Sequence, residues 1–190
     1  EFYVNGNILS TVNVVKDLNE GDLYVFSPQG DTLKIKSYIK GKPTGPYIEY
    51  HPNGRIMSKG QYKLGRRHGE WMDYYYSGSL AVKYNYKNGN LHGDYLNLDS
   101  GGDTLSYKNY SNGLLNGVDK DYIKNKKVLW EHIFKNGKLK KYYNYSPDGV
   151  LLSKGKKEYL LNDRFGFRYI EGTKKGNNFH GQYTVFWKNG

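Results

Sequence analysis

The chain has 190 residues, of which 37% are apolar, and it carries a formal net charge of +11 and no cysteine. Lack of cysteine excludes disulfides and thiolate zinc sites but leaves the compartment open, while the positive charge either favours anionic partners or serves solubility alone. Because 21 residues are tyrosine, whose hydroxyl tolerates water, the composition favours a thin sheet over a thick aliphatic core.

From the N-terminus through about two-thirds of the chain, glycines recur every 24 residues. Three interleaved series keep this spacing: Gly6, Gly30, Gly54, Gly78 and Gly102; Gly41, Gly65, Gly89, Gly113 and Gly137; and Gly21, Gly45, Gly69, Gly93 and Gly117. A fixed period of this length is the signature of a repeat array, whose units bury apolar surface against their neighbours. This organisation favours function on a surface over function in a pocket.

Each period contains two segments with the composition of strands. Residues 70–76 and 80–87, for example, are rich in aromatic and β-branched types and are bounded by Ser77-Gly78 and by the segment 89–93. Asn-Gly and Asp-Gly dipeptides, typical of hairpin turns, recur along the chain. The expected structural turn glycines are Gly54, Gly65, Gly69, Gly78, Gly89, Gly93, Gly113 and Gly117. The sequence therefore predicts an all-β protein, a single-layer antiparallel meander of 24-residue β-hairpin repeats.

The regular spacing ends near residue 143. We expect residues 1–143 to hold the regular repeats, with an incomplete first unit. Residues 144–190 are expected to continue the array with a slip in register and one shortened hairpin, and both ends fall inside a unit, as in a fragment of a longer array. No window approaches the roughly 18 apolar residues of a membrane span, and residues 1–20 do not resemble a signal peptide. We expect a soluble chain of unknown location.

Candidate catalytic and metal-binding groups are better explained by structure. Asp99-Ser100-Gly101-Gly102 is similar to the surroundings of a serine nucleophile, but it lies where hairpin turns are expected. His68 and His92 are one unit apart, about 10 Å, which is too far for a shared zinc ion, and we expect them to fix hairpins through backbone hydrogen bonds.

The acidic column Glu49, Asp73 and Asp121 is likewise spaced by whole units, and a solvated face explains it. We therefore expect no enzyme activity, catalytic residue, metal, cofactor or small-molecule substrate.

Basic and aromatic residues alternate along one predicted edge. Lys63, Lys87 and Lys135 each follow an aromatic residue, and adjoining turns add further cations. The predicted partner-binding residues are Tyr62, Lys63, Arg66, Arg67, His68, Tyr86, Lys87, His92, Lys135 and Lys138. Such a strip suits a protein with an acidic patch, or a polyanion such as nucleic acid or an anionic lipid surface. The alternative is that these are ordinary charged turns that keep a thin sheet soluble.

Residues 62–78 read aromatic, glycine, His-Gly-x-aromatic and turn glycine, and the pattern recurs at 86–95 and in part at 180–183. This pattern resembles a MORN repeat, and the 24-residue period is similar to the MORN variant repeats of bacterial YwqK-like proteins, a family of toxin–antitoxin antitoxins. Thr44, Asn116 and Lys140 stand near the places equivalent to His68 and His92, so the fold does not require histidine there.

The resemblance implies a single-layer hairpin array that acts as a non-catalytic docking scaffold, most simply for another protein and, in its antitoxin-like form, by neutralising it. The alternatives are a polyanion binder that uses the basic strip and a structural spacer in a larger assembly. The sequence leaves open the partner, the sheet face used and the oligomeric state.

Overall fold

The computed structural model describes residues 1–123, 127–155, 160–163, 166–175 and 178–186. These residues form strands and turns without any helix, so the predicted all-β class is confirmed, and they accordingly include no helix long and apolar enough to cross a membrane. The chain divides into two units, Glu1–Gly155 and Lys156–Gly190.

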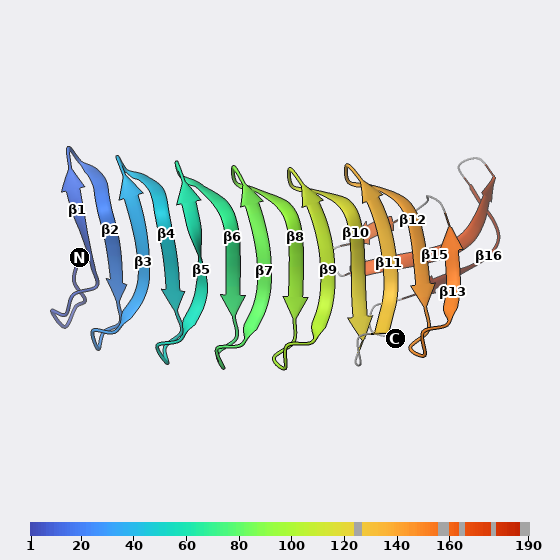
Figure 1. The fold of residues 1–190 in the computed structure, drawn as a ribbon, viewed down its shortest axis with the longest axis horizontal. Coiled ribbons are helices and arrows are strands. Elements are labelled where there is room, and N and C mark those ends of the chain that lie inside the picture. The colour runs from blue at the N-terminus through green and yellow to red at the C-terminus, as the bar shows by residue number, and fades with distance from the viewer. Residues whose placement is uncertain (124–126, 156–159, 164–165, 176–177, 187–190) are drawn as a thin grey trace. The chain divides into compact units, whose positions relative to one another are not determined.

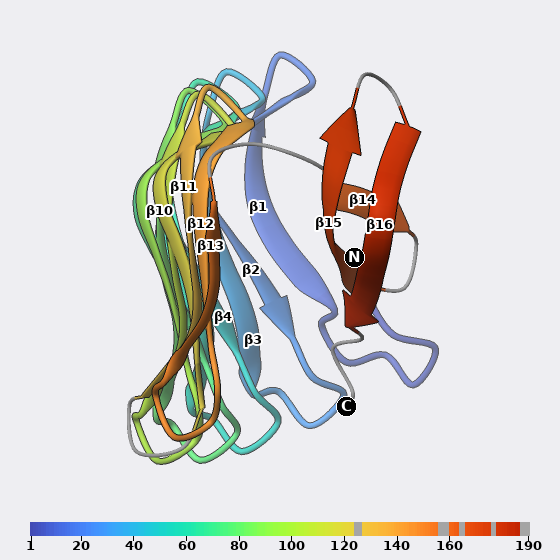
Figure 2. The ribbon, with the colours of Figure 1, turned by 90° about the vertical axis from the view of Figure 1, so that its right-hand side faces the viewer.

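The first unit is one 13-stranded sheet in which each strand pairs antiparallel with the strands before and after it in sequence (Figure 1). Its strands are β1 (Ser10–Val15), β2 (Leu18–Phe26), β3 (Thr32–Ile39), β4 (Lys42–Tyr50), β5 (Ile56–Lys63), β6 (Arg66–Tyr74), β7 (Leu80–Lys87), β8 (Asn90–Leu98), β9 (Thr104–Ser111), β10 (Leu114–Ile123), β11 (Lys127–Lys135), β12 (Lys138–Tyr145) and β13 (Leu151–Gly155). Viewed along the row of strands, this sheet is a single curved layer (Figure 2). The predicted hairpin meander is therefore confirmed.

The second unit contains a three-stranded antiparallel sheet of β14 (Leu160–Asp163), β15 (Gly166–Lys175) and β16 (Asn178–Phe186). The first sheet continues past residue 143 through β12 and β13 to Gly155. The division predicted at residue 143 stays a prediction. The predicted truncation of the array at Gly190 lies outside the described residues.

The periodic glycines mark three kinds of place in every hairpin, and all members of the three series have positive φ. Gly78 and its equivalents close the turns at one edge of the sheet, and Gly65 and its equivalents close the turns at the other. Gly69 and its equivalents lie inside strands, beside a shift of register such as the one between Lys59 and Gln61. Glycine recurs there because other L-residues rarely adopt this backbone conformation.

Burial is concentrated on one side of the first sheet, here called the aromatic face. The face carries Tyr47, Tyr62, Trp71, Tyr84, Tyr86, Tyr95, Tyr110, Trp130 and Phe134, as the strand register shows. Trp71 is 0% exposed. Neighbouring rings pack edge-on or stacked along the row, with centroids of Trp71 and Tyr62 5.3 Å apart. Ring-on-ring packing across strands thus replaces the second layer that most sheets use.

Candidate functional site: the stacked hairpin edge

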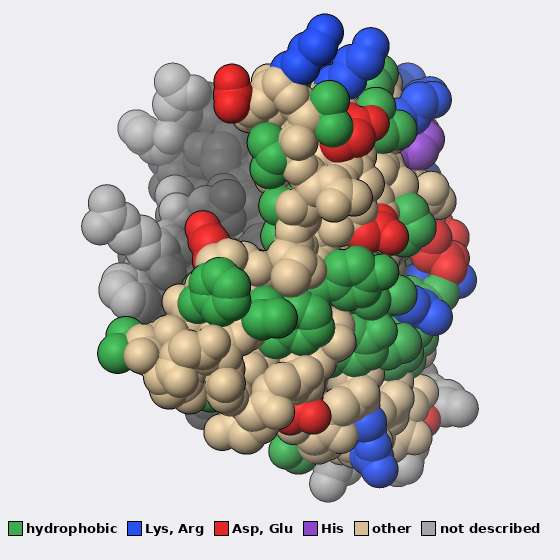
Figure 3. All heavy atoms as spheres, turned by 90° about the vertical axis from the view of Figure 1, so that its left-hand side faces the viewer, with side chains coloured by type: hydrophobic (Ala, Val, Ile, Leu, Met, Phe, Trp, Pro, Cys, Tyr) green, Lys and Arg blue, Asp and Glu red, His purple; other side chains and the backbone are tan. Residues whose placement is uncertain are grey.

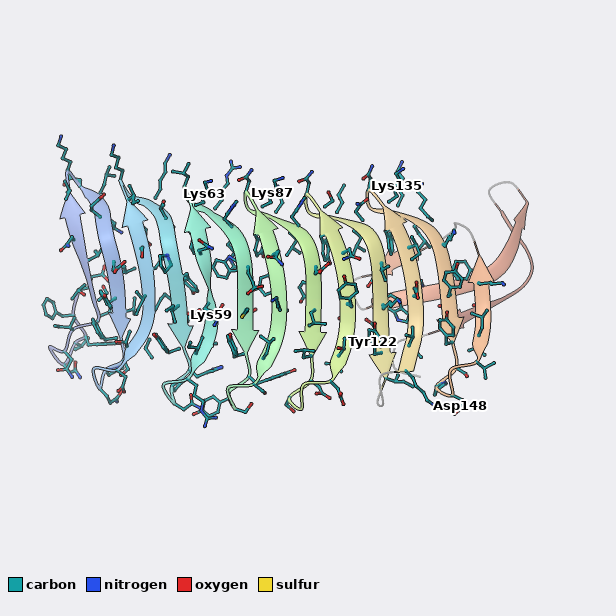
Figure 4. The ribbon with its side chains drawn as sticks, in the orientation of Figure 1. Lys59, Lys63, Lys87, Tyr122, Lys135 and Asp148 are labelled. Atoms are coloured by element: carbon teal, nitrogen blue, oxygen red, sulfur yellow. The ribbon has the colours of Figure 1, made fainter. Side chains whose placement is uncertain are left out.

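Tight turns lie in a row at one end of the strands, and this long edge of the sheet brings together basic residues from successive hairpins. Lys63, Lys87 and Lys135 project from this edge, whereas Tyr122 and Asp148 lie toward the opposite one (Figure 4). We call the following set the basic edge: Lys16, Lys40, Lys42, Lys63, Arg66, Lys87, Lys135 and Lys138. Seen from the β1 end, Lys and Arg side chains gather at these hairpin tips (Figure 3).

The turns at the basic edge are short and hydrogen-bonded to one another. Both residues of the Asn88-Gly89 turn have positive φ, as type I′ turns require, and so do those of Leu64-Gly65. The Gly89 N–H donates to the Arg67 carbonyl of the preceding hairpin at 2.9 Å, and equivalent bonds join the other tips. Adjacent tips therefore follow one another at about twice the strand spacing, roughly 9.6 Å.

Side chains one hairpin away reinforce this stack. The Asn112 N–H donates to His92 Nδ1 at 3.4 Å, and the Asn136 N–H donates to Asn116 Oδ1 at 3.0 Å. The predicted role of His92 in fixing a hairpin through the backbone is thus confirmed. The same prediction is not confirmed for His68, whose Nδ1 is buried and has no hydrogen-bond partner among the described residues.

Among the described residues, no acidic side chain forms an ion pair with a cation of the basic edge. Four ion pairs occur among the described residues, and all use lysines elsewhere: Lys34–Glu49, Lys83–Glu70, Lys108–Asp119 and Lys120–Glu131. Lys63, Arg66, Lys87, Lys135 and Lys138 are exposed and form no ion pair with any residue in the described part of the chain. Their charge is directed to solvent, where it can attract an anionic partner.

The predicted partner-binding residues fall into three places. Lys63, Arg66, Lys87, Lys135 and Lys138 meet at the basic edge. Tyr62, Arg67 and Tyr86 instead belong to the aromatic face. The Arg67 guanidinium lies 4.3 Å from the centroid of the Trp71 ring, a cation–π contact that makes this residue part of the packing.

His68 and His92 lie in a shallow groove of about 470 Å³ between neighbouring hairpins, next to the basic edge. The groove is lined by His68, Gly69, Asn85, Tyr86, Lys87, His92, Gly93 and Asp94. The repeat spacing identified each histidine as a candidate but did not show that the two share a groove. The groove itself follows from the stacking of the hairpins.

The acidic column does not lie on a solvated face, and that prediction is wrong. Tyr47 Oη donates to Glu49 at 2.7 Å, while Ser58 Oγ and Tyr84 Oη donate to Asp73 at 2.7 and 2.8 Å. Burial alone would raise the pKa of Glu49, but the bonds from Lys34 and Tyr47 outweigh it and hold that pKa below its usual value. Burial and the bond to Asp73 raise the pKa of Tyr84. These carboxylates stabilise the aromatic face.

A second polar cluster on this face was not predicted from the sequence. Asp119 is 1% exposed and His132 2% exposed, and the Lys108 ammonium lies 3.2 Å from Asp119. The His132 ring stacks on Trp130 with centroids 4.5 Å apart, and burial lowers the pKa of His132 to about 4. Burial raises the pKa of Asp119, although the neighbouring Lys108 opposes that shift. Asp119 and His132 occupy positions in the sheet that continue the row of aromatic residues. Their burial becomes evident only from the strand register.

The segment Asp99-Ser100-Gly101-Gly102, which is similar to the surroundings of a serine nucleophile, forms a turn. The Gly102 N–H donates to the Asp99 carbonyl at 3.0 Å, and the Gly101 and Asp103 N–H groups both donate to Asp99 Oδ1 at 2.9 Å. The predicted turn is confirmed. Among the residues that the structure describes, no group of three or more His, Cys, Asp or Glu side chains could hold a metal ion.

Comparison with known families supports the repeat assignment at the centre of the sheet. The model of the MORN repeat variant matches residues 43–64 and 67–88, two stretches whose starts lie one period apart. They cover β4 to β7 and include Lys63, Lys87 and His68. A comparison with curated proteins gives no match. These two stretches are therefore similar to MORN variant units, a non-catalytic repeat type that generally serves binding and scaffolding.

Proposed function

We propose that this protein is a non-catalytic repeat scaffold that docks a protein partner with an acidic patch along its basic edge. The observation that carries the proposal is a row of exposed cations, held on stacked turns, that form no ion pair with any described residue. Rigid presentation lowers the entropic cost of binding, and unpaired cations steer an acidic protein toward the edge.

The make-up of the edge favours a protein over a polyanion. Leu64 at one tip is 68% exposed and Leu114 at another is 53% exposed. The hairpin tip between Ser111 and Leu114 carries no cation, so the positive charge is interrupted. Apolar side chains among cations suit a protein interface, whereas phosphate backbones are best matched by continuous positive charge. In the form implied by the resemblance to YwqK-like proteins, the docked partner is a toxin that is neutralised by binding.

Charge reversal tests this proposal. The edge variant carries Lys63→Glu, Lys87→Glu and Lys135→Glu, which the structure places on one side (Figure 4). A control variant with the same change of net charge carries Lys127→Glu, Lys141→Glu and Lys154→Glu at exposed positions outside the basic edge. Arg67 is left unchanged because its guanidinium packs on Trp71. Partners captured from source-cell extract with wild-type protein are then purified, and their affinity for each variant is measured.

The edge variant is expected to lose at least about tenfold in affinity for a captured protein, while the control variant binds as wild type does. Equal affinity in all three proteins would contradict docking at the basic edge. A steep log–log dependence of affinity on salt, with nucleic acid or anionic vesicles replacing the protein, would instead establish polyanion binding. Absence of any captured component would favour the structural spacer.

A further inference from the structure

We propose that the groove between His68 and His92 is a subsite that receives a carboxylate side chain of the docked protein. This inference rests on the proposed docking function and adds a specific contact to it. The groove lies beside Lys87, so an acidic segment bound along the edge has access to it. It also falls between two consecutive hairpins, where the sheet offers a recess instead of a projecting tip.

A backbone hydrogen bond determines which ring nitrogen of His92 can donate. The Asn112 N–H donates to His92 Nδ1, so Nδ1 must carry a lone pair and the neutral ring carries its proton on Nε2. His92 thereby presents a donor that the turn itself does not use. His68 occupies the equivalent position one hairpin earlier and lines the same groove, although its Nδ1 is buried.

One oxygen of the acidic group in the groove lining, Asp94 Oδ1, already accepts hydrogen bonds. Asp94 accepts hydrogen bonds from Tyr107 Oη at 2.8 Å and from Asn109 Nδ2 at 2.6 Å. Lys87 forms no ion pair with any described residue. The groups of the lining that can donate to an anionic ligand therefore include the Lys87 ammonium and the Nε2 of His92. A carboxylate satisfies both through charge-assisted hydrogen bonds, whereas an amide satisfies them more weakly.

The protein itself shows which residue can replace His92 in a test of the carboxylate subsite. At the position equivalent to His92, Asn116 Oδ1 accepts the Asn136 N–H at 3.0 Å. A His68→Asn/His92→Asn variant therefore keeps an acceptor for the turn at position 92 and replaces the imidazole Nε2 donor by the Nδ2 donor of a shorter, neutral amide. Asn116→His is the matched control, because it adds a histidine at the same structural position on a neighbouring hairpin. Thermal melts of both variants report whether the fold is retained.

The probe is a fluorescent peptide of alternating glutamate and serine, compared with a peptide in which glutamine replaces glutamate. With the full chain, His68→Asn/His92→Asn is expected to weaken glutamate-peptide binding at least about fivefold, and Asn116→His to leave it unchanged. Peptide addition should also shift the NMR signals of the His92 ring in wild-type protein. Unchanged affinity in the histidine variant, or equal binding of the glutamine peptide, would overturn the subsite.

A further variant, Lys63→Glu/Lys135→Glu, separates this inference from the docking proposal because it leaves Lys87 and both histidines intact. Weaker binding in this variant together with normal binding in the histidine variant would retain the docking edge and reject the groove. Normal binding here with weaker binding in the histidine variant would retain the groove and reject the edge. Inorganic phosphate that competes as well as the glutamate peptide would show that the groove selects anions in general, which also rejects the carboxylate subsite.

Discussion

Trp71 is fully buried in a sheet of one layer because its neighbour across the strands has no side chain. The indole lies over Gly60, and a Cβ added to that glycine would come within 2.2 Å of the ring. Tyr47 and Tyr62 pack against the same ring, each with centroids 5.3 Å away, and Arg67 covers it. Gly60 does not have positive φ, so it provides space and not an unusual conformation.

We therefore expect Gly60→Ala to reduce the free energy of unfolding by about 1–3 kcal/mol, because the ring must move from a packed position. In a Trp71→Leu background, the same substitution should be close to neutral or slightly stabilising, since glycine weakens a strand interior. Urea unfolding of the four proteins of this double-mutant cycle measures the coupling. Equal losses in both backgrounds would show that the backbone at Gly60, and not the indole, requires glycine.

For individual residues, the sequence predicted the backbone conformation of the glycines but not the sheet face on which some charged side chains lie. The three glycine series were predicted because their spacing is visible, and positive φ at all of them confirms it. Arg67 and Glu49 were misplaced because they were interpreted from their neighbouring turn and their unit spacing, without assigning the two faces of each strand. Arg67 lies on the face of Trp71, and Glu49 on that of Tyr47. Tyr62 and Arg67 lie directly opposite each other on the aromatic face, a relation that the linear sequence does not display.

At the level of the hairpin, the turns of the basic edge differ in how well their first residue suits its conformation. Leu64 has φ of 50°, and Asn88, Asn112 and Asn136 occupy the same position with nearly the same φ. Asparagine tolerates this region far better than leucine does. Leu64 is also 68% exposed, so little burial compensates for its strain.

Leu64→Asn should accordingly stabilise the protein by about 0.5–1 kcal/mol, and Asn88→Leu should destabilise it by a similar amount. Chemical denaturation of the two single variants and wild type provides the comparison. The opposite order, with Leu64→Asn less stable than wild type, would mean that the exposed leucine makes packing contacts worth more than its backbone strain.

Over the whole first unit, the architecture follows from the period and the function does not. A 24-residue repeat of paired strands with turn glycines permits few folds other than a meander, and the sheet runs from β1 to β13 in chain order. The basic edge was predictable to the extent that Lys63, Lys87 and Lys135 share a column. The groove beside it was not, because it depends on how consecutive hairpins stack.

Since each strand of the first sheet pairs only with its sequence neighbours, stability should be approximately a sum over hairpins and their interfaces. Deleting residues 64–87, one full period, joins Lys63 to the Asn88-Gly89 turn. β5 would then pair with β8 in the original register, with Tyr62 facing Leu91 as Tyr86 does now. We expect a folded protein with a lower melting temperature and the same far-ultraviolet circular dichroism per residue.

Deletion of residues 64–88, one residue longer, is the control. It leaves only Gly89 between Lys63 and Asn90, too short for a hairpin turn, so β5 and β8 must slip. A slip of one residue turns every side chain of a strand to the other face and would expose the tyrosines of the aromatic face. The control should therefore aggregate or lose its cooperative melt. Equal folding of both deletions would show that the 24-residue register is not what holds the hairpins together. Similar loss of structure in both would show that the array is stabilised as one cooperative body instead of hairpin by hairpin.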